Sequence, residues 1–282
     1  MKHRAKTDGY FAGVDIGASY TKCVAVDDQG RIVRSAVIQT GFDFTENARK
    51  VFGEVSTGLD GKVVQTCSTG YGRKNVGFAS MNRTEIACQS LGCFKEFGME
   101  ASIVDIGGQD VKIIRIDGAG KRVNFKMNRK CAAGTGAFIE EIAFKIKIPV
   151  DQLEEIAQSA TGEVTLGSFC TVFTATEILS HIRGQTPLPN IVRGIYRSVA
   201  KRISEMDSFS GKVIFTGGLA KRGSVLSKMI AEETGSDVSV PEHPQITCAY
   251  GAALYAKETY LSPSKSRSET NLLGSMGSSL ET

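Results

Sequence analysis

Short apolar runs near the N-terminus alternate with turns that carry an acid and a glycine. The run at 10–14 leads into Asp15, Ile16 and Gly17, and a second run follows at 22–26 before another polar turn. A third run covers 31–39. Apolar segments of this length, bounded by Asp and Gly, are typical of strands joined in β-hairpins.

The same pattern returns ninety residues further along the chain. Residues 14–33 and 104–123 align at this offset without a gap, and eight of the twenty positions are identical. A match of this kind indicates a duplicated building block. In the first copy the identical positions are Val14, Asp15, Ile16, Gly17, Lys22, Asp27, Gly30 and Val33.

Apolar residues elsewhere recur at helical spacing. The expected helices cover 44–55, 83–97, a segment that starts just after Gly136, 153–159, 172–182, 191–206 and 248–260. We interpret Asp151 and Glu154 as a capping box that opens the helix at 153–159. Further short strands are expected at 62–67, 164–166 and 212–215.

The repeat predicts two domains. A first domain covers 1–97, with an N-terminal extension at 1–9, and a second covers 98–261. We expect the last helix of the second domain to pack back toward the first. Residues 262–282 contain seven serines and few large apolar groups, which is typical of a flexible tail.

Composition and charge narrow the function classes. The net charge of +4 comes from scattered basic residues, so no nucleic-acid partner is expected. The long apolar candidates are interrupted by Asp15, Asp105 and Glu177, so no membrane span is expected. No uncharged apolar stretch follows the basic N-terminus, and the seven cysteines include no C-x-x-C pair. We therefore expect a cytoplasmic protein whose thiols stay reduced.

Three glycine-bearing turns each follow a predicted strand. They are Asp15-Ile16-Gly17, Asp105-Ile106-Gly107-Gly108 and Thr216-Gly217-Gly218. This order resembles the sugar kinase/Hsp70/actin superfamily of ATPases over roughly 10–258. The resemblance implies an α/β fold, with two related ribonuclease-H-like domains and a nucleotide cleft between them.

That resemblance also implies roles for the residues of the turns. Asp15, Asp105 and Gln109 would be catalytic, with Gln109 or Asp110 near the attacking water. Phosphoryl transfer needs mainly positioning and charge neutralisation, which amides, a cation and acid-held Mg²⁺ supply. The residues implied to bind ATP and Mg²⁺ are Asp15, Gly17, Ser19, Thr21, Lys22, Asp105, Gly107, Gly108, Gln109, Gly217 and Gly218.

The two lysines that follow the acids are ambiguous in the sequence. Lys22 is either a phosphate ligand or an exposed strand residue. We interpret its counterpart Lys112 as an exposed strand residue.

Two of the cysteines share a context. Cys131 and Cys170 each precede a predicted helix, where the free N–H groups and the helix dipole lower a thiol pKa and stabilise negative charge. Two cysteines cannot hold a cubane iron–sulfur cluster, which uses four thiolates, but a twofold dimer would supply four. Buried, inert cysteine is the alternative. We interpret the remaining cysteines, Cys23, Cys67, Cys88, Cys93 and Cys248, as packing residues.

The segments around these cysteines resemble a narrower family, the BadF/BadG/BcrA/BcrD-type ATPases. This family includes the activators of 2-hydroxyacyl-CoA dehydratases and the ATPase subunits of benzoyl-CoA reductase. The resemblance is carried by Thr69–Arg73, Asp105–Asp110, Met127–Asn128, Cys131–Gly136, Cys170–Phe173 and Thr216–Gly218.

The narrower resemblance implies that Cys131 and Cys170 hold one [4Fe-4S] cluster shared between the subunits of a dimer, of like or paralogous chains. ATP hydrolysis would drive an electron from the cluster into a 2-hydroxyacyl-CoA dehydratase or a benzoyl-CoA reductase. A ferredoxin or flavodoxin would supply that electron.

Two departures from the activator pattern leave the partner open. Ala137 stands where activators often have Arg, and Ala175 stands where they have the first of two glutamates. An ATPase subunit of a benzoyl-CoA reductase complex in aromatic degradation is therefore an alternative. From other classes, a small-molecule kinase on the same fold and a regulatory nucleotide-binding module are further alternatives.

Overall fold

The computed structural model describes residues 9–167, 170–221 and 224–262. The extension predicted at 1–9 and the tail predicted at 262–282 lie almost wholly outside the described residues. The chain divides into two compact units. It passes from unit 1 into unit 2 between Cys88 and Gln89, inside helix α2 (Glu85–Phe97), and returns at the start of helix α8 (Thr247–Leu261).

Unit 1 contains a mixed five-stranded sheet in the order β3-β2-β1-β4-β5. The first three strands form an antiparallel meander, and β4 and β5 run parallel to β1. Helix α1 (Phe44–Ser56) begins at Asp43, whose carboxylate accepts from the backbone N–H groups of the first turn. The strands are β1 (Gly9–Ile16), β2 (Tyr20–Val26), β3 (Ile32–Gln39), β4 (Lys62–Gly70) and β5 (Met81–Asn82).

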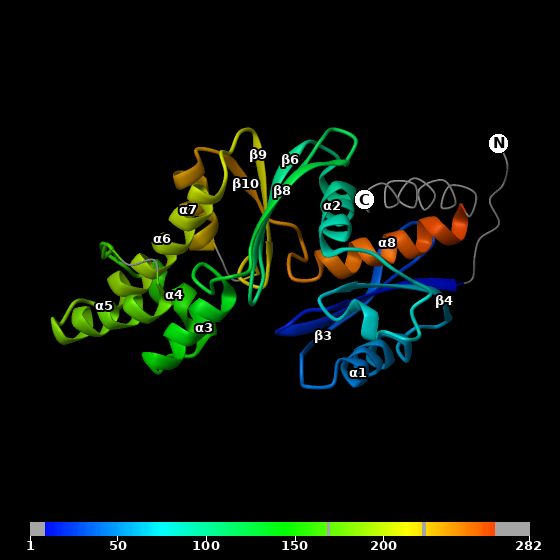
Figure 1. The fold of residues 1–282 in the computed structure, drawn as a ribbon, viewed down its shortest axis with the longest axis horizontal. Coiled ribbons are helices and arrows are strands. Elements are labelled where there is room, and N and C mark those ends of the chain that lie inside the picture. The colour runs from blue at the N-terminus through cyan, green and yellow to red at the C-terminus, as the bar shows by residue number, and fades with distance from the viewer. Residues whose placement is uncertain (1–8, 168–169, 222–223, 263–282) are drawn as a thin grey trace, which may run out of the picture. The chain divides into compact units, whose positions relative to one another are not determined.

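Unit 2 contains a second mixed five-stranded sheet, in the order β10-β9-β6-β7-β8. Figure 1 shows helices α3 to α7 on one side of this sheet, where apolar residues of β6 and β9 join those of α6 in one core. The strands are β6 (Ala101–Ile106), β7 (Val111–Ile116), β8 (Arg122–Asn128), β9 (Lys212–Gly217) and β10 (Asp237–Ser239). The helices are α3 (Gly136–Lys145), α4 (Leu153–Gln158), α5 (Thr171–Arg183), α6 (Leu188–Met206) and α7 (Ser224–Thr234).

The sequence repeat is confirmed at the level of register and hydrogen bonds. Asp15 pairs with Lys22 across β1 and β2, and Asp105 pairs with Lys112 across β6 and β7. The two hairpin turns close with equivalent backbone hydrogen bonds. The N–H of Gly17 donates to Tyr20 O at 3.1 Å, and the N–H of Gly107 donates to Asp110 O at 2.9 Å. The next turn in each copy also matches. Asp27 and Asp117 each accept hydrogen bonds from the backbone N–H groups two and four residues further along the chain.

The structural repeat extends beyond the aligned segment. Strand β4 places Thr69 opposite Asp15, and strand β9 places Thr216 opposite Asp105. The next residue on each strand is a glycine, with φ of +92° at Gly70 and +99° at Gly217. Since different lengths of chain separate these dipeptides from their hairpins, no single sequence offset brings them into alignment.

Two local predictions are wrong. The segment at 164–166 is irregular rather than a strand, because the N–H of Val164 bonds to Asn190 O and its carbonyl lies against Gly194 of α6. The capping box is also absent, since α4 begins at Gln152 without a side-chain cap. Glu154 instead accepts from the Ser224 hydroxyl and the Val225 N–H, so it caps α7. The elements β5, α7 and β10 were not predicted.

Within unit 1, the backbone of helix α8 packs closely against the backbone of β1 and of the first part of α2. A Cβ added at Gly13 of β1 would lie 2.0 Å from Ala249 O, and one added at Gly251 would lie 1.8 Å from Cys88 O of α2. The two glycines therefore set the distance between α8 and its neighbours. None of the described helices is apolar over a length sufficient to cross a bilayer.

This packing predicts opposite effects of one substitution at two helix-interior glycines. Gly251→Ala should destabilise the protein by about 2 kcal/mol, because a methyl group there overpacks a backbone contact. Gly53→Ala in α1 meets nothing within 4 Å and should stabilise by roughly 0.5–1 kcal/mol through helix propensity. Denaturant unfolding measures both, and equal stability of the two variants would contradict the packing argument.

Candidate functional site

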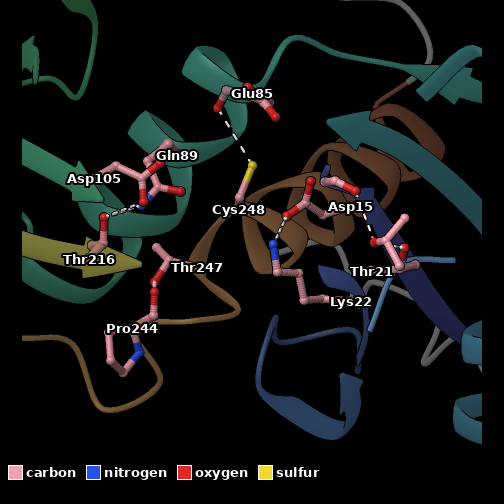
Figure 2. A network of polar contacts seen from close by, with 12 residues as sticks. Asp15, Thr21, Lys22, Glu85, Gln89, Asp105, Thr216, Pro244, Thr247 and Cys248 are labelled. Atoms are coloured by element: carbon pink, nitrogen blue, oxygen red, sulfur yellow. Dashed lines mark hydrogen bonds and ion pairs between the residues drawn. The ribbon is translucent and has the colours of Figure 1, made fainter. Parts of the chain in front are cut away.

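The first candidate site surrounds Asp15, which ends strand β1 of unit 1. The Lys22 ammonium lies 3.0 Å from Asp15 Oδ2, as Figure 2 shows. The other carboxylate oxygen, Oδ1, is buried and has no hydrogen-bond partner among the residues that the structure describes. An unsatisfied buried oxygen is costly, so Oδ1 marks a position for a bound ion, water or ligand.

The hairpin turn next to Asp15 is held by threonines. The Thr40 hydroxyl donates to Gly17 O and lies 2.9 Å from the Thr21 hydroxyl, while Thr40 N donates to Ser19 O. Thr21 is fully buried and therefore supports the turn rather than lining a ligand surface. Ser19 and Lys22 are half-buried.

The second candidate site surrounds Asp105 in unit 2. The Lys112 ammonium lies 2.6 Å from Asp110 Oδ1 and 3.5 Å from Asp105 Oδ2. Our interpretation of Lys112 as an exposed residue is wrong, because its side chain is only 5% exposed. The antiparallel register places Lys112 opposite Asp105, and Asp110 lies two residues before it on the chain. The buried ammonium is therefore paired with two carboxylates. Gln109 is exposed at the tip of the turn.

The remaining oxygen of Asp105 is held from strand β9. The Thr216 hydroxyl donates to Asp105 Oδ1 at 3.0 Å, and Gln89 Nε2 of α2 donates to Thr216 Oγ1 at 2.7 Å. Figure 2 shows these residues as one chain of polar contacts. Sequence reasoning missed Gln89, because an isolated Gln in an amphipathic helix carries no signal. It also assigned no role to Thr69, although Thr69–Arg73 carries part of the family resemblance and Thr69 and Gly70 form the same Thr-Gly pair as Thr216 and Gly217.

The third glycine turn has a structural reason for its glycine. A Cβ at Gly217 would lie 2.1 Å from Ile106 O, and φ is +99° at this residue. The N–H of Gly217 donates to Pro244 O at 2.9 Å. Gly218 is exposed and follows directly.

Cys131 and Cys170 both lie in unit 2 and are accessible. Cys170 is exposed and is the N-cap residue of α5, where its carbonyl accepts from the Thr174 N–H and hydroxyl. Cys131 is half-buried in the loop before α3, and its carbonyl accepts from Asn128 Nδ2 at 3.3 Å. Within the described part of the chain, no three His, Cys, Asp or Glu side chains are grouped as metal ligands.

Four of the other cysteines are confirmed as core residues. Cys23, Cys67, Cys88 and Cys93 are fully buried. Burial raises the pKa of Cys23 to about 12 and the pKa values of Cys88 and Cys93 well above the ordinary value, which makes these thiols inert. Cys248 is half-buried at the start of α8, with its thiol 3.7 Å from Glu85 O.

A backbone joint connects the second glycine turn to the helix after Cys131. The N–H groups of Gly136 and Ala137 donate to the carbonyls of Gly107 and Gly108, each at 2.9 Å. These donors belong to the first turn of α3, where helical N–H groups have no partner within the helix. Two backbone hydrogen bonds therefore join the glycine turn of the second hairpin directly to the N-terminus of α3.

The helices next to the two cysteines expose apolar side chains. Phe173 of α5 is 65% exposed and Phe144 of α3 is 80% exposed. Val172 and Leu179 of α5 are also exposed. Large exposed apolar residues that gather on neighbouring helices are typical of interaction surfaces.

Two related units, each with a mixed sheet and an acid–glycine hairpin, have the fold of the sugar kinase/Hsp70/actin ATPases. A ROK family glucokinase from Streptomyces griseus shares this fold, with a TM-score of 0.58 at 14% identity over 89% of this chain and all of that one. More narrowly, residues 12–256 match the BadF/BadG/BcrA/BcrD ATPase family, and the chain belongs to that family.

Among its relatives are dehydratase activators. The chain is 38% identical to the 2-hydroxyisocaproyl-CoA dehydratase activator of Clostridioides difficile, over 88% of this chain and 94% of the relative. The solved structure of such an activator from Clostridium difficile, with bound ADPNP, has a TM-score of 0.84 at 35% identity. It covers 92% of this chain and 97% of that one.

The acid–lysine geometry predicts unequal effects of removing the two lysines. Lys112→Met removes a buried cation that two half-buried carboxylates, Asp105 and Asp110, share, and should cost about 3 kcal/mol of unfolding free energy. Lys22→Met removes a cation that is more exposed than Lys112 and that pairs with one carboxylate, Asp15, rather than two, so it should cost less. Urea unfolding measures both, with the exposed Lys121→Met as a control. A Lys112→Met variant as stable as the control would contradict the paired arrangement.

Proposed function

We propose that this chain is an ATP-hydrolysing activator that delivers single electrons to a 2-hydroxyacyl-CoA dehydratase. The observation that most supports this proposal is the pair of hydrogen bonds between Gly107–Gly108 and the first turn of α3. These bonds link the proposed phosphate-binding turn to the loop that contains Cys131. The similarity to dehydratase activators over almost the whole chain supports the choice of partner class.

The nucleotide is held, in this proposal, by the two hairpin turns. Asp15 offers the unsatisfied Oδ1 to Mg²⁺ or to a water bound to it. Lys22 neutralises the β- and γ-phosphates, and the N–H of Ser19 donates to them, while Gly17 leaves room for the phosphates because it has no side chain. In unit 2, Asp105, Gly107 and Gly108 are the residues proposed for the γ-phosphate, and the exposed Gln109 is proposed to orient the attacking water. Gly217 and Gly218 lie against the adenosine.

Cys131 and Cys170 fit the cluster that the family resemblance implies. Both thiols are accessible, and Cys170 begins a helix whose free N–H groups stabilise negative charge. Four thiolates are needed, so two chains would each contribute this pair, and the exposed apolar residues of α5 would meet the second chain. When bound, the cluster supplies low-potential one-electron chemistry, with a reduced ferredoxin or flavodoxin as the donor. Such chemistry suits a reducing, cytoplasmic setting.

Coupling follows from what the chain's own residues do. Nucleotide contacts pull on Gly107 and Gly108, and these residues carry the N-terminus of α3 with them. The loop that precedes α3 is braced at Thr135, which bonds to Ala132 O, and at the Asn128–Cys131 bond. Because this loop is short and braced at both ends, a displacement of the turn reaches Cys131.

The proposal predicts iron content from specific thiols. Protein purified without oxygen should be brown and contain about four iron atoms per two chains. Cys131→Ser and Cys170→Ser should each lose this iron, because a cluster with a missing ligand is unstable. Cys248→Ser removes a half-buried thiol of unit 1 and should keep it. A colourless wild-type protein, or one that phosphorylates a sugar, would refute the activator proposal.

The proposal also predicts that the two functions separate in one variant. Asp105→Ala should abolish ATP-dependent activation of the dehydratase, because Mg·ATP loses a carboxylate, while the cluster's visible absorption stays unchanged. Asp237→Ala changes an exposed acid of the same unit and serves as the matched control. Activation that survives in Asp105→Ala would rule out the assigned role of this acid.

A further inference from the structure

The contacts of Asp105 include a chain of hydrogen bonds that starts on α2. Gln89 donates to Thr216, and Thr216 donates to Asp105 Oδ1, with distances of 2.7 and 3.0 Å. Gln89 is 2% exposed and Thr216 is fully buried. Bonds in such a setting are strong, and removing one member leaves the others without a substitute from water.

The donor and the acceptor of each hydrogen bond in this series follow from the chemistry of the three side chains. The Gln89 Nε2 group is a donor only, so the Thr216 oxygen accepts from it. The single hydrogen of the Thr216 hydroxyl is then available for Asp105 Oδ1, since the alternative acceptor, Val104 O, lies at 3.5 Å. Gln89 thereby orients the Thr216 hydroxyl toward the carboxylate.

Unit 1 provides an internal comparison. Thr69 stands opposite Asp15 as Thr216 stands opposite Asp105, but Thr69 Oγ1 and Asp15 Oδ1 are buried without a hydrogen bond of ordinary geometry to any described residue. The side chain next to the Thr69 hydroxyl is the thiol of Cys88. Burial raises the pKa of this thiol, and its contact with Thr69 lowers that pKa. A thiol is a weak partner, so it does not orient Thr69 as the Gln89 amide orients Thr216.

We propose that Gln89 is a positioning residue for Asp105, and that it acts through Thr216. Together with Lys112 on Oδ2, the Thr216 hydroxyl fixes both carboxylate oxygens, and each oxygen keeps a lone pair for Mg²⁺ or its water. The inference rests on the proposed function, in which Asp105 meets Mg·ATP.

The test measures ATP hydrolysis by the full chain as a function of Mg²⁺ concentration. Gln89→Met and Thr216→Val should each raise the Mg²⁺ concentration for half-maximal rate about tenfold, as expected for one hydrogen bond to a carboxylate. Both should lower kcat and leave the KM for ATP at saturating Mg²⁺ little changed. Thr216→Ser keeps the hydroxyl and should restore wild-type behaviour.

A double-mutant cycle separates positioning from general damage. Because Gln89 acts through Thr216, the double variant should be no worse than Thr216→Val alone. Gln65→Met is the matched control: it removes a half-buried amide whose one hydrogen bond to the described residues is a long one, to Met81 Sδ at 3.8 Å, and should keep the wild-type Mg²⁺ dependence. All variants are compared below the temperature at which circular dichroism shows unfolding.

The outcomes distinguish this inference from the proposed function. If Asp105→Ala is inactive but Gln89→Met keeps the wild-type Mg²⁺ dependence, the positioning role is overturned and the ATP site stands. Additive effects in the double variant would also overturn it. If Asp105→Ala hydrolyses ATP normally, the assignment of Asp105 to the nucleotide site fails instead. Should Gln89→Met not fold, Thr216→Val against Thr216→Ser still decides whether the hydroxyl sets the metal dependence.

Discussion

The structure depends on a carboxylate at the end of a strand, opposite a lysine on the next strand. This pair occurs once in each unit, at the buried Asp15 and the half-buried Asp105, and the neutralising lysine allows the acid to lie largely out of water. The strand then turns at a glycine, so the acid stands beside backbone N–H groups. This arrangement stabilises the fold. It also suits a phosphate site, because the lysine charge and the backbone N–H groups act more strongly on a bound anion where little water screens them.

The two copies of this arrangement are not equivalent. Asp15 keeps one oxygen unsatisfied, whereas both oxygens of Asp105 are engaged. The carboxylate of the first site therefore still lacks a partner for one oxygen, and the carboxylate of the second is held on both oxygens by neighbouring side chains. What specialises unit 2 lies outside the repeat, in the helices between β8 and β9 that carry Cys131 and Cys170. The joint at Gly136 and Ala137 connects that insertion to the repeated turn.

The sequence predicted the hairpins well because their determinants are local. Apolar alternation, Asp and Gly at fixed offsets and the ninety-residue repeat all act within a few residues of the structure they specify. Predictions failed where a residue's partner is distant in sequence. Glu154 caps α7 rather than α4, and Val164 packs on α6 rather than entering a sheet. Lys112 was misjudged because a lone lysine in a strand is usually exposed, and only the register shows two acids around it.

In the proposed mechanism, the nucleotide turn and the cysteine loop of unit 2 move together. The most direct test is the rate at which a ferrous-iron chelator removes iron from the anaerobically purified protein, with and without Mg·ATP. We expect bound nucleotide to change this rate several-fold, because movement of Gly107 and Gly108 alters the surroundings of Cys131. An identical rate in the presence and absence of bound nucleotide would contradict it.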